Sequence, residues 1–149
     1  MQINRALIAG LAVSGLLLSG NVIAGDTVEV KASGMKFDPV VVFVKAGDTV
    51  QWTGLPTASH DAVAIPSMIP EGAEVFNKKE EGATVTLTEE GAYVYKCSPH
   101  LGLGMVGAIV VGDKMPANME QIQKSPENKG PVARTVKELE KEVEAKFGK

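Results

Sequence analysis

The chain has 149 residues, with 15 basic and 18 acidic side chains and a net charge of −3. This mild acidity excludes a protein that binds nucleic acids through a basic surface. The chain has a single cysteine, Cys97, which excludes an internal disulfide. Three roles remain for that thiol: a buried structural cysteine, an intermolecular bridge or a metal-bound thiolate.

Residues 1–24 are predicted to be a secretory signal peptide. Arg5 gives a positive charge ahead of an uninterrupted run of apolar and small residues at 6–18, and small residues lead up to Ala24. The run is short for a bilayer span, so we expect cleavage after Ala24 and no remaining membrane anchor. The mature protein, residues 25–149, is long enough for one domain with one core.

The region from residue 27 to residue 111 is predicted to be mainly β. Short runs rich in β-branched and aromatic residues recur there, with glycine and proline between them. The predicted strands are 28–32, 40–44, 49–53, 84–88, 92–97 and 106–111. Such spacing is typical of a sandwich or a barrel. The proline-containing stretch at 65–74 shows little periodicity and is predicted to be a loop.

Two helices are predicted after Gly112. The first, at 116–123, opens on a proline, which helices prefer at their start. The second, at 131–147, carries one apolar stripe, which consists of Val132, Val136, Leu139, Val143 and Phe147. Such a stripe binds a partner or a membrane, or it packs on the β domain. We favour packing, because short amphipathic helices gain most of their stability from tertiary contacts.

The stretch at 97–105 carries the chemistry of this chain. It places a thiol, an imidazole and a thioether at spacings of three and five residues, in Cys97, His100 and Met105. The chain has only one other histidine, His60. A cysteine and two histidines in a plane, with a weak axial methionine, form a blue-copper electron-transfer site. We therefore predict one copper ion, bound by His60, Cys97, His100 and Met105.

Two other uses of these residues fit the set less well. A nucleophilic cysteine with a histidine base would need an oxyanion hole and a substrate cleft, and it leaves Met105 without a role. A structural zinc site prefers several cysteines or histidines and does not select a thioether. The complete set therefore favours copper, and we do not expect an enzyme.

These residues resemble the cupredoxin family and, within it, the pseudoazurins. The spacing within 97–105 is that of pseudoazurin and plastocyanin, while the stretches at 65–74 and 111–119 are similar to pseudoazurin segments. The resemblance implies a Greek-key β-sandwich of eight strands followed by two C-terminal α-helices. We expect the sandwich and copper site at 25–112, and a helical extension packed on it at 113–149.

The resemblance also implies a function. It predicts a monomeric, periplasmic type 1 copper protein that shuttles single electrons to redox enzymes such as the copper nitrite reductase of denitrification. The expected electron donor is a respiratory-chain cytochrome. Residues 101–104 would belong to an apolar docking patch around His100. The alternative is a periplasmic copper-binding or delivery protein of the same fold. A metal-free adhesion or scaffold module is disfavoured, because all four ligand types are present.

The chain departs from the family pattern at two positions. Asp61 follows the first histidine, where the family usually has an asparagine that bonds across to the cysteine loop. We expect Asp61 to accept a hydrogen bond from a backbone N–H or from Ser98. Ala58 stands where a lysine is common. The ring of lysines expected around the docking face is Lys31, Lys36, Lys78, Lys79 and Lys96.

Overall fold

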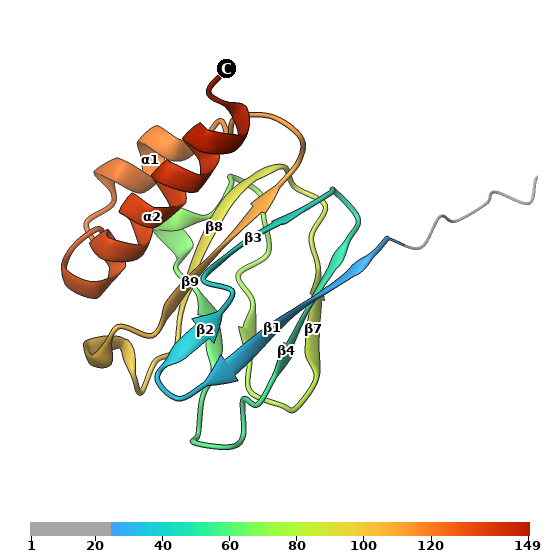
Figure 1. The fold of residues 1–149 in the computed structure, drawn as a ribbon, viewed down its shortest axis with the longest axis vertical. Helices are drawn as coiled ribbons and strands as arrows, with labels where there is room; N and C mark the ends of the chain where they lie inside the picture. Colours follow the sequence, from blue (N-terminus) through green and yellow to red (C-terminus); the bar gives the residue numbers. More distant parts are fainter. Residues whose placement is uncertain (1–24) are drawn as a thin grey trace, which may run out of the picture.

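The computed structural model describes residues 25–149, so the predicted signal peptide at 1–24 lies outside the described residues. Two β-sheets pack face to face, and two helices near the C-terminus cover the outer face of one sheet (Figure 1). The predicted class, a mainly β sandwich with two C-terminal helices, is confirmed.

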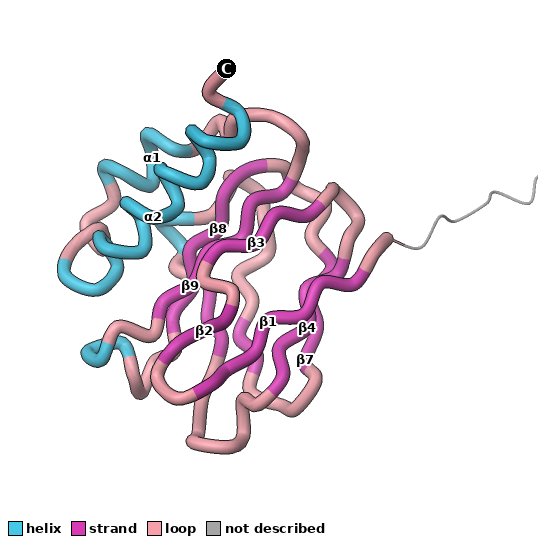
Figure 2. The backbone as a smooth tube through the Cα atoms, viewed as in Figure 1, coloured by secondary structure: helices cyan, strands magenta, loops and turns pink. Residues whose placement is uncertain are grey.

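The first sheet has the strand order β2-β1-β4-β7 (Figure 2). Its strands are β1 (Thr27–Ser33), β2 (Lys36–Asp38), β4 (Thr49–Thr53) and β7 (Ala83–Thr86). Strand β1 pairs with β4 in parallel, and the other two pairings are antiparallel. Burial alternates along β4, where Val50 and Trp52 face the core, because one side of this sheet faces solvent.

The second sheet has the order β3-β9-β8-β5-β6. Its strands are β3 (Val41–Val44), β5 (Ala62–Ala64), β6 (Asn77–Lys78), β8 (Gly91–Lys96) and β9 (Val106–Val111). Every residue of β9 is buried. The sandwich interior covers one face of this strand and the helices cover the other, which explains its uninterrupted apolar sequence.

Helices α1 (Met119–Lys124) and α2 (Gly130–Phe147) follow the sandwich. The stripe predicted on α2 packs in one cluster with Val94, Ala108 and Val110, on the outer side of β8 and β9. The packing interpretation of that stripe is therefore confirmed. Within residues 25–149, no helix is long and apolar enough to cross a bilayer.

The structure adds short elements that the sequence pattern did not reveal. Nine strands are assigned within the described residues instead of the eight implied, and β2, β5 and β6 are only two or three residues long. The predicted loop at 65–74 contains a short 3₁₀ helix, η1 (Pro66–Met68). The first C-terminal helix begins at Met119, three residues later than its proline suggested.

An aromatic cluster fills the sandwich next to the end of β8. Tyr95 contacts Phe37, Trp52 and Phe76, with ring centroids 4.7 to 6.0 Å apart. All four side chains are almost completely buried. Because aromatic side chains bury large areas in fixed orientations, this cluster holds the strand that ends immediately before Cys97.

Candidate metal centre

The loop after β8 brings three of the predicted site residues together. The Cys97 N–H donates to the Met105 carbonyl over 2.9 Å, and the Met105 N–H donates to the His100 carbonyl over 3.2 Å. Between them lies the 3₁₀ helix η2 (Leu101–Leu103), which ends at Gly104 with a φ of +96°. That left-handed backbone favours glycine and reverses the chain toward β9. The loop is thus closed on itself by its own backbone.

His60 reaches the same place from the loop between β4 and β5. Its N–H donates to the Leu55 carbonyl over 2.7 Å, which anchors the loop. The preceding residue, Ser59, has a φ of +56°, a strained conformation for a residue with a side chain. His60 itself is only 4% exposed. The sequence carried no signal for this turn, because neither glycine nor asparagine occupies position 59.

The pairing of β5 with β8 aligns the two loops. Val63 lies opposite Lys96 in this antiparallel pair. Continuing that register two residues past the ladder places Asp61 opposite Ser98. There the Asp61 carboxylate accepts a hydrogen bond from the Ser98 N–H. The expected link between Asp61 and the cysteine loop is therefore confirmed, and the side chain extends the strand pairing into the site.

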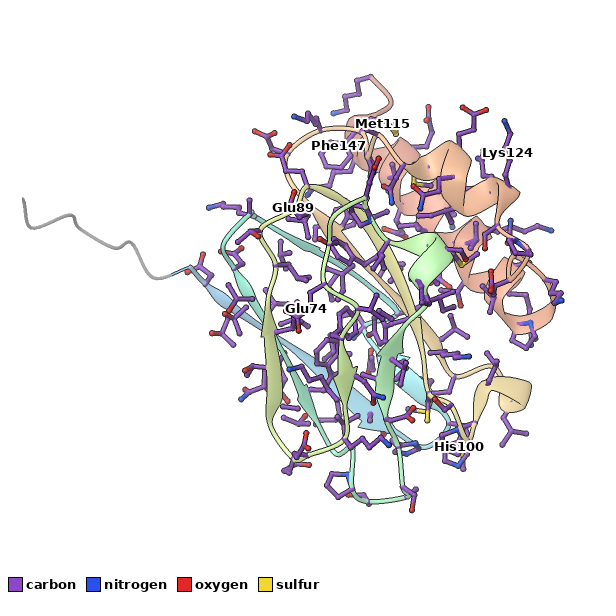
Figure 3. All side chains as sticks on the ribbon, turned by 180° about the vertical axis from the view of Figure 1, so that it is seen from behind. Glu74, Glu89, His100, Met115, Lys124 and Phe147 are labelled. Atoms are coloured by element: carbon purple, nitrogen blue, oxygen red, sulfur yellow. The ribbon has the colours of Figure 1, made fainter. Side chains whose placement is uncertain are left out.

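Three electron-pair donors converge at this end of the sandwich. The Nδ1 atoms of His60 and His100 are 3.0 Å apart. The Cys97 sulfur lies 3.7 Å from the His60 nitrogen and 3.3 Å from the His100 nitrogen. The three side chains can therefore offer their donor atoms to one ion. Figure 3 shows His100 at the end of the molecule opposite Phe147 and Met115.

The surroundings suit metal binding by the two deeply buried groups. Burial lowers the pKa of His60, the nearby His100 lowers it further, and Asp61 opposes both. The lowered pKa favours the neutral imidazole, which is the form that binds metals. Burial raises the pKa of the Cys97 thiol. A thiol in such surroundings loses its proton readily only when a cation replaces it, as a bound metal does.

Met105 is fully buried and lies in the same core cluster as Cys97. Its backbone forms two of the hydrogen bonds that close the loop, and these bonds fix the backbone position of Met105 relative to Cys97 and His100. Its role as the axial ligand stays a prediction.

The donor set itself discriminates between metals. Two imidazoles and one thiolate, of which His60 and Cys97 are buried and His100 is partly exposed, suit copper in both of its oxidation states. The residues present therefore fit a copper ion. A family model described as copper binding proteins of the plastocyanin/azurin family matches residues 24–112. The chain belongs to this family.

Individual relatives narrow the assignment within the family. The chain is 39% identical to the pseudoazurin of Methylorubrum extorquens over 137 residues, which span 87% of this chain and 90% of that protein. It is 42% identical to the pseudoazurin of Paracoccus pantotrophus over 92 residues, 60% of this chain and 61% of the relative. The chain thus spans less than two thirds of the Paracoccus protein. The cupredoxin is therefore placed among the pseudoazurins.

Solved structures agree with this placement. The pseudoazurin of Methylobacterium extorquens AM1 superposes with a TM-score of 0.61 at 35% identity, covering 80% of this chain and 98% of that one. The pseudoazurin of Hyphomicrobium denitrificans gives 0.62 at 32% identity, covering 80% and 97%. Copper is accordingly the cofactor of this cupredoxin, and the prediction of a copper protein is confirmed.

The loop that carries His100 also forms part of the surface. Leu103 is 67% exposed, while Leu101 is partly buried and Gly102 is exposed. Leu103 therefore does not fill the core, while Leu101 packs in part against the core cluster under α2. An apolar side chain this exposed, three residues after His100, is consistent with the docking patch that the resemblance implied.

Proposed function

We propose that this pseudoazurin-like protein is a periplasmic electron carrier with one type 1 copper ion. His60, Cys97, His100 and Met105 would hold the copper, which would supply the one-electron redox chemistry. The observation that carries the proposal is the convergence of the two imidazole nitrogens and the thiol sulfur from two separate loops.

The rigidity of those loops suits electron transfer. Cu(I) and Cu(II) prefer different coordination, so a carrier works best when its ligands hold a compromise geometry in both states. Here three hydrogen bonds between protein groups hold the loops: from Cys97 to Met105, from His60 to Leu55 and from Ser98 to Asp61. The ligands need little rearrangement when an electron arrives or leaves.

The proposed partners are redox proteins. A respiratory-chain cytochrome supplies the electron, and a copper nitrite reductase or another periplasmic reductase accepts it. The exposed Leu103 beside His100 offers a small apolar contact, which suits the weak and brief complexes of electron-transfer proteins. We propose that the protein works as a monomer and catalyses no reaction of its own.

The first test is a visible absorption titration of the mature protein, residues 25–149, with Cu(II). We expect an intense charge-transfer band that reductant bleaches and oxidant restores with the copper retained. Cys97→Ser should lose the band. Ser98→Ala is the matched control, because the bond to Asp61 comes from the backbone of Ser98 and survives the substitution.

The outcome separates the two candidate functions. If the band is absent, or if copper leaves after one redox cycle, the carrier proposal fails and copper delivery takes its place. Retained copper with reversible cycling supports the carrier. Stopped-flow oxidation of the reduced protein by copper nitrite reductase then tests the proposed acceptor. Fractionation of cells that express the full chain tests export to the periplasm.

A further inference from the structure

A small cavity lies beside the metal centre, between the cysteine loop and the start of α2. Its volume is about 240 Å³. Lys96, which directly precedes Cys97, and Leu101, which directly follows His100, both line it. The opposite wall is the first turn of α2. Neither the copper site nor its closing hydrogen bonds use this cavity.

The interior of the cavity is apolar. It is lined by Ile65, Leu101, Pro131 and Val132, of which Ile65 and Val132 are at most 4% exposed. An apolar cavity of roughly 150 Å³ is large enough to hold benzene. The present cavity therefore has room for one aromatic ring with one short substituent, and its lining favours an apolar body.

Two lysines and one glutamate also line the cavity, Lys96, Lys129 and Glu127. Neither lysine forms an ion pair within residues 25–149. The hydroxyls of Ser67 and Ser125 donate to the Glu127 carboxylate over 2.6 and 2.8 Å. These two bonds tie Glu127 to η1 and to the start of the α1–α2 connection, and they lower its pKa. Two cations against one hydrogen-bonded carboxylate give the lining a net positive charge, which favours an anion.

We propose that this cavity is a binding site for a compact aromatic carboxylate. The ring lies against Ile65, Pro131 and Val132, and the carboxylate faces the ammonium groups of Lys96 and Lys129. The apolar contact provides most of the affinity and the charge selects the ligand, which is the usual division in small-molecule sites. This site goes beyond electron transfer, because it takes a small molecule and not a redox protein.

Benzoate is the probe for the test. Backbone amide shifts of the copper-loaded, reduced protein are followed by NMR, since Cu(I) is diamagnetic. We expect saturable shifts centred on Leu101 and Val132. Benzyl alcohol, which keeps the ring and lacks the charge, should bind at least tenfold more weakly. Acetate, which keeps the charge and lacks the ring, should give no saturable shift.

Two charge-reversal variants complete the test. Lys129→Glu should weaken benzoate binding at least fivefold, and because Lys129 is exposed the fold should be unaffected. Lys141→Glu, on the exposed side of α2 away from the cavity, is the matched control and should leave binding unchanged. Shifts spread over the whole surface, equal binding of benzyl alcohol, or equal effects of the two variants would each overturn the proposal. Because benzoate binding is measured without any electron transfer, the proposed binding site can be refuted even when reversible redox cycling of the copper is observed.

Discussion

Removal of the Leu139 side chain tests whether α2 is an integral part of the sandwich. Leu139 is 0% exposed and packs in the cluster that joins α2 to the outer face of β8 and β9. Leu→Ala changes at such fully buried positions cost roughly 3–5 kcal/mol, because they lose apolar burial and leave a cavity. We therefore expect Leu139→Ala to destabilise the copper-free protein by about 3 kcal/mol.

The expected change in melting temperature follows from the size of the domain. Unfolding entropy is roughly 2.1 cal/mol/K per residue, which gives about 260 cal/mol/K for residues 25–149. A loss of about 3 kcal/mol then lowers Tm by about 11 °C. Urea unfolding and thermal melts of the copper-free protein measure both values without the added stability of a bound metal.

Leu103→Ala is the matched control, because it makes the same chemical change at a side chain that is 67% exposed. It should cost less than about 0.5 kcal/mol, as surface substitutions usually do. The reasoning is refuted if Leu139→Ala costs no more than Leu103→Ala. That result would mean that α2 contributes nothing to the stability of the sandwich.

Three further predictions concern charge. Asp61→Asn should raise the reduction potential, since it removes a negative charge bonded to the cysteine loop and a less negative site favours Cu(I); an unchanged or lower potential in voltammetry would contradict this. Burial, with Glu89 adding to it, raises the pKa of Tyr93 to about 12. The unfolded chain therefore loses this proton first, near pH 10. The contribution of Tyr93 to the free energy of unfolding should be fully present below pH 10 and should fall by on the order of 2 kcal/mol as pH approaches 12. Urea melts at several pH values should show this loss, and the loss should be smaller in Tyr93→Phe. If the lysine ring steers docking, the rate of electron transfer to an acidic partner falls as salt is added, and a salt-independent rate in stopped-flow would exclude steering.

Periodicity predicted the larger elements because each face of such an element keeps the same environment along the whole element. The stripe from Val132 to Val143 repeats at helical spacing, and β9 is apolar throughout because both of its faces are covered. Strands β5 and β6 have three and two residues, which is too short for any period to be read. Strand β5 pairs with β8 and β6 pairs with β5, and these contacts between distant segments could not be predicted from local sequence.

The donor set was predictable because it rests on residue types that are scarce in this chain. One cysteine and two histidines leave a single combination, whatever the fold. The positions of the supporting groups were not predictable in the same way. The left-handed Ser59 and the anchor of His60 on Leu55 depend on how the β4–β5 loop crosses the end of the sandwich. No short sequence pattern encodes that crossing.

The register of the β5–β8 pair connects the fold to the metal site. Because side chains alternate between the two faces of a strand, a slip of one residue between β5 and β8 would turn every side chain of β5 to the other face. Such a slip would also misalign Asp61 with Ser98 and carry His60 away from Cys97. The three-residue strand β5 is short for this task. The bond from the Ser98 N–H to the Asp61 carboxylate adds one more link to the ladder at the point where the donors must meet. Asp61 thereby has a structural task, namely to fix the register that brings the two histidines and the cysteine to one point.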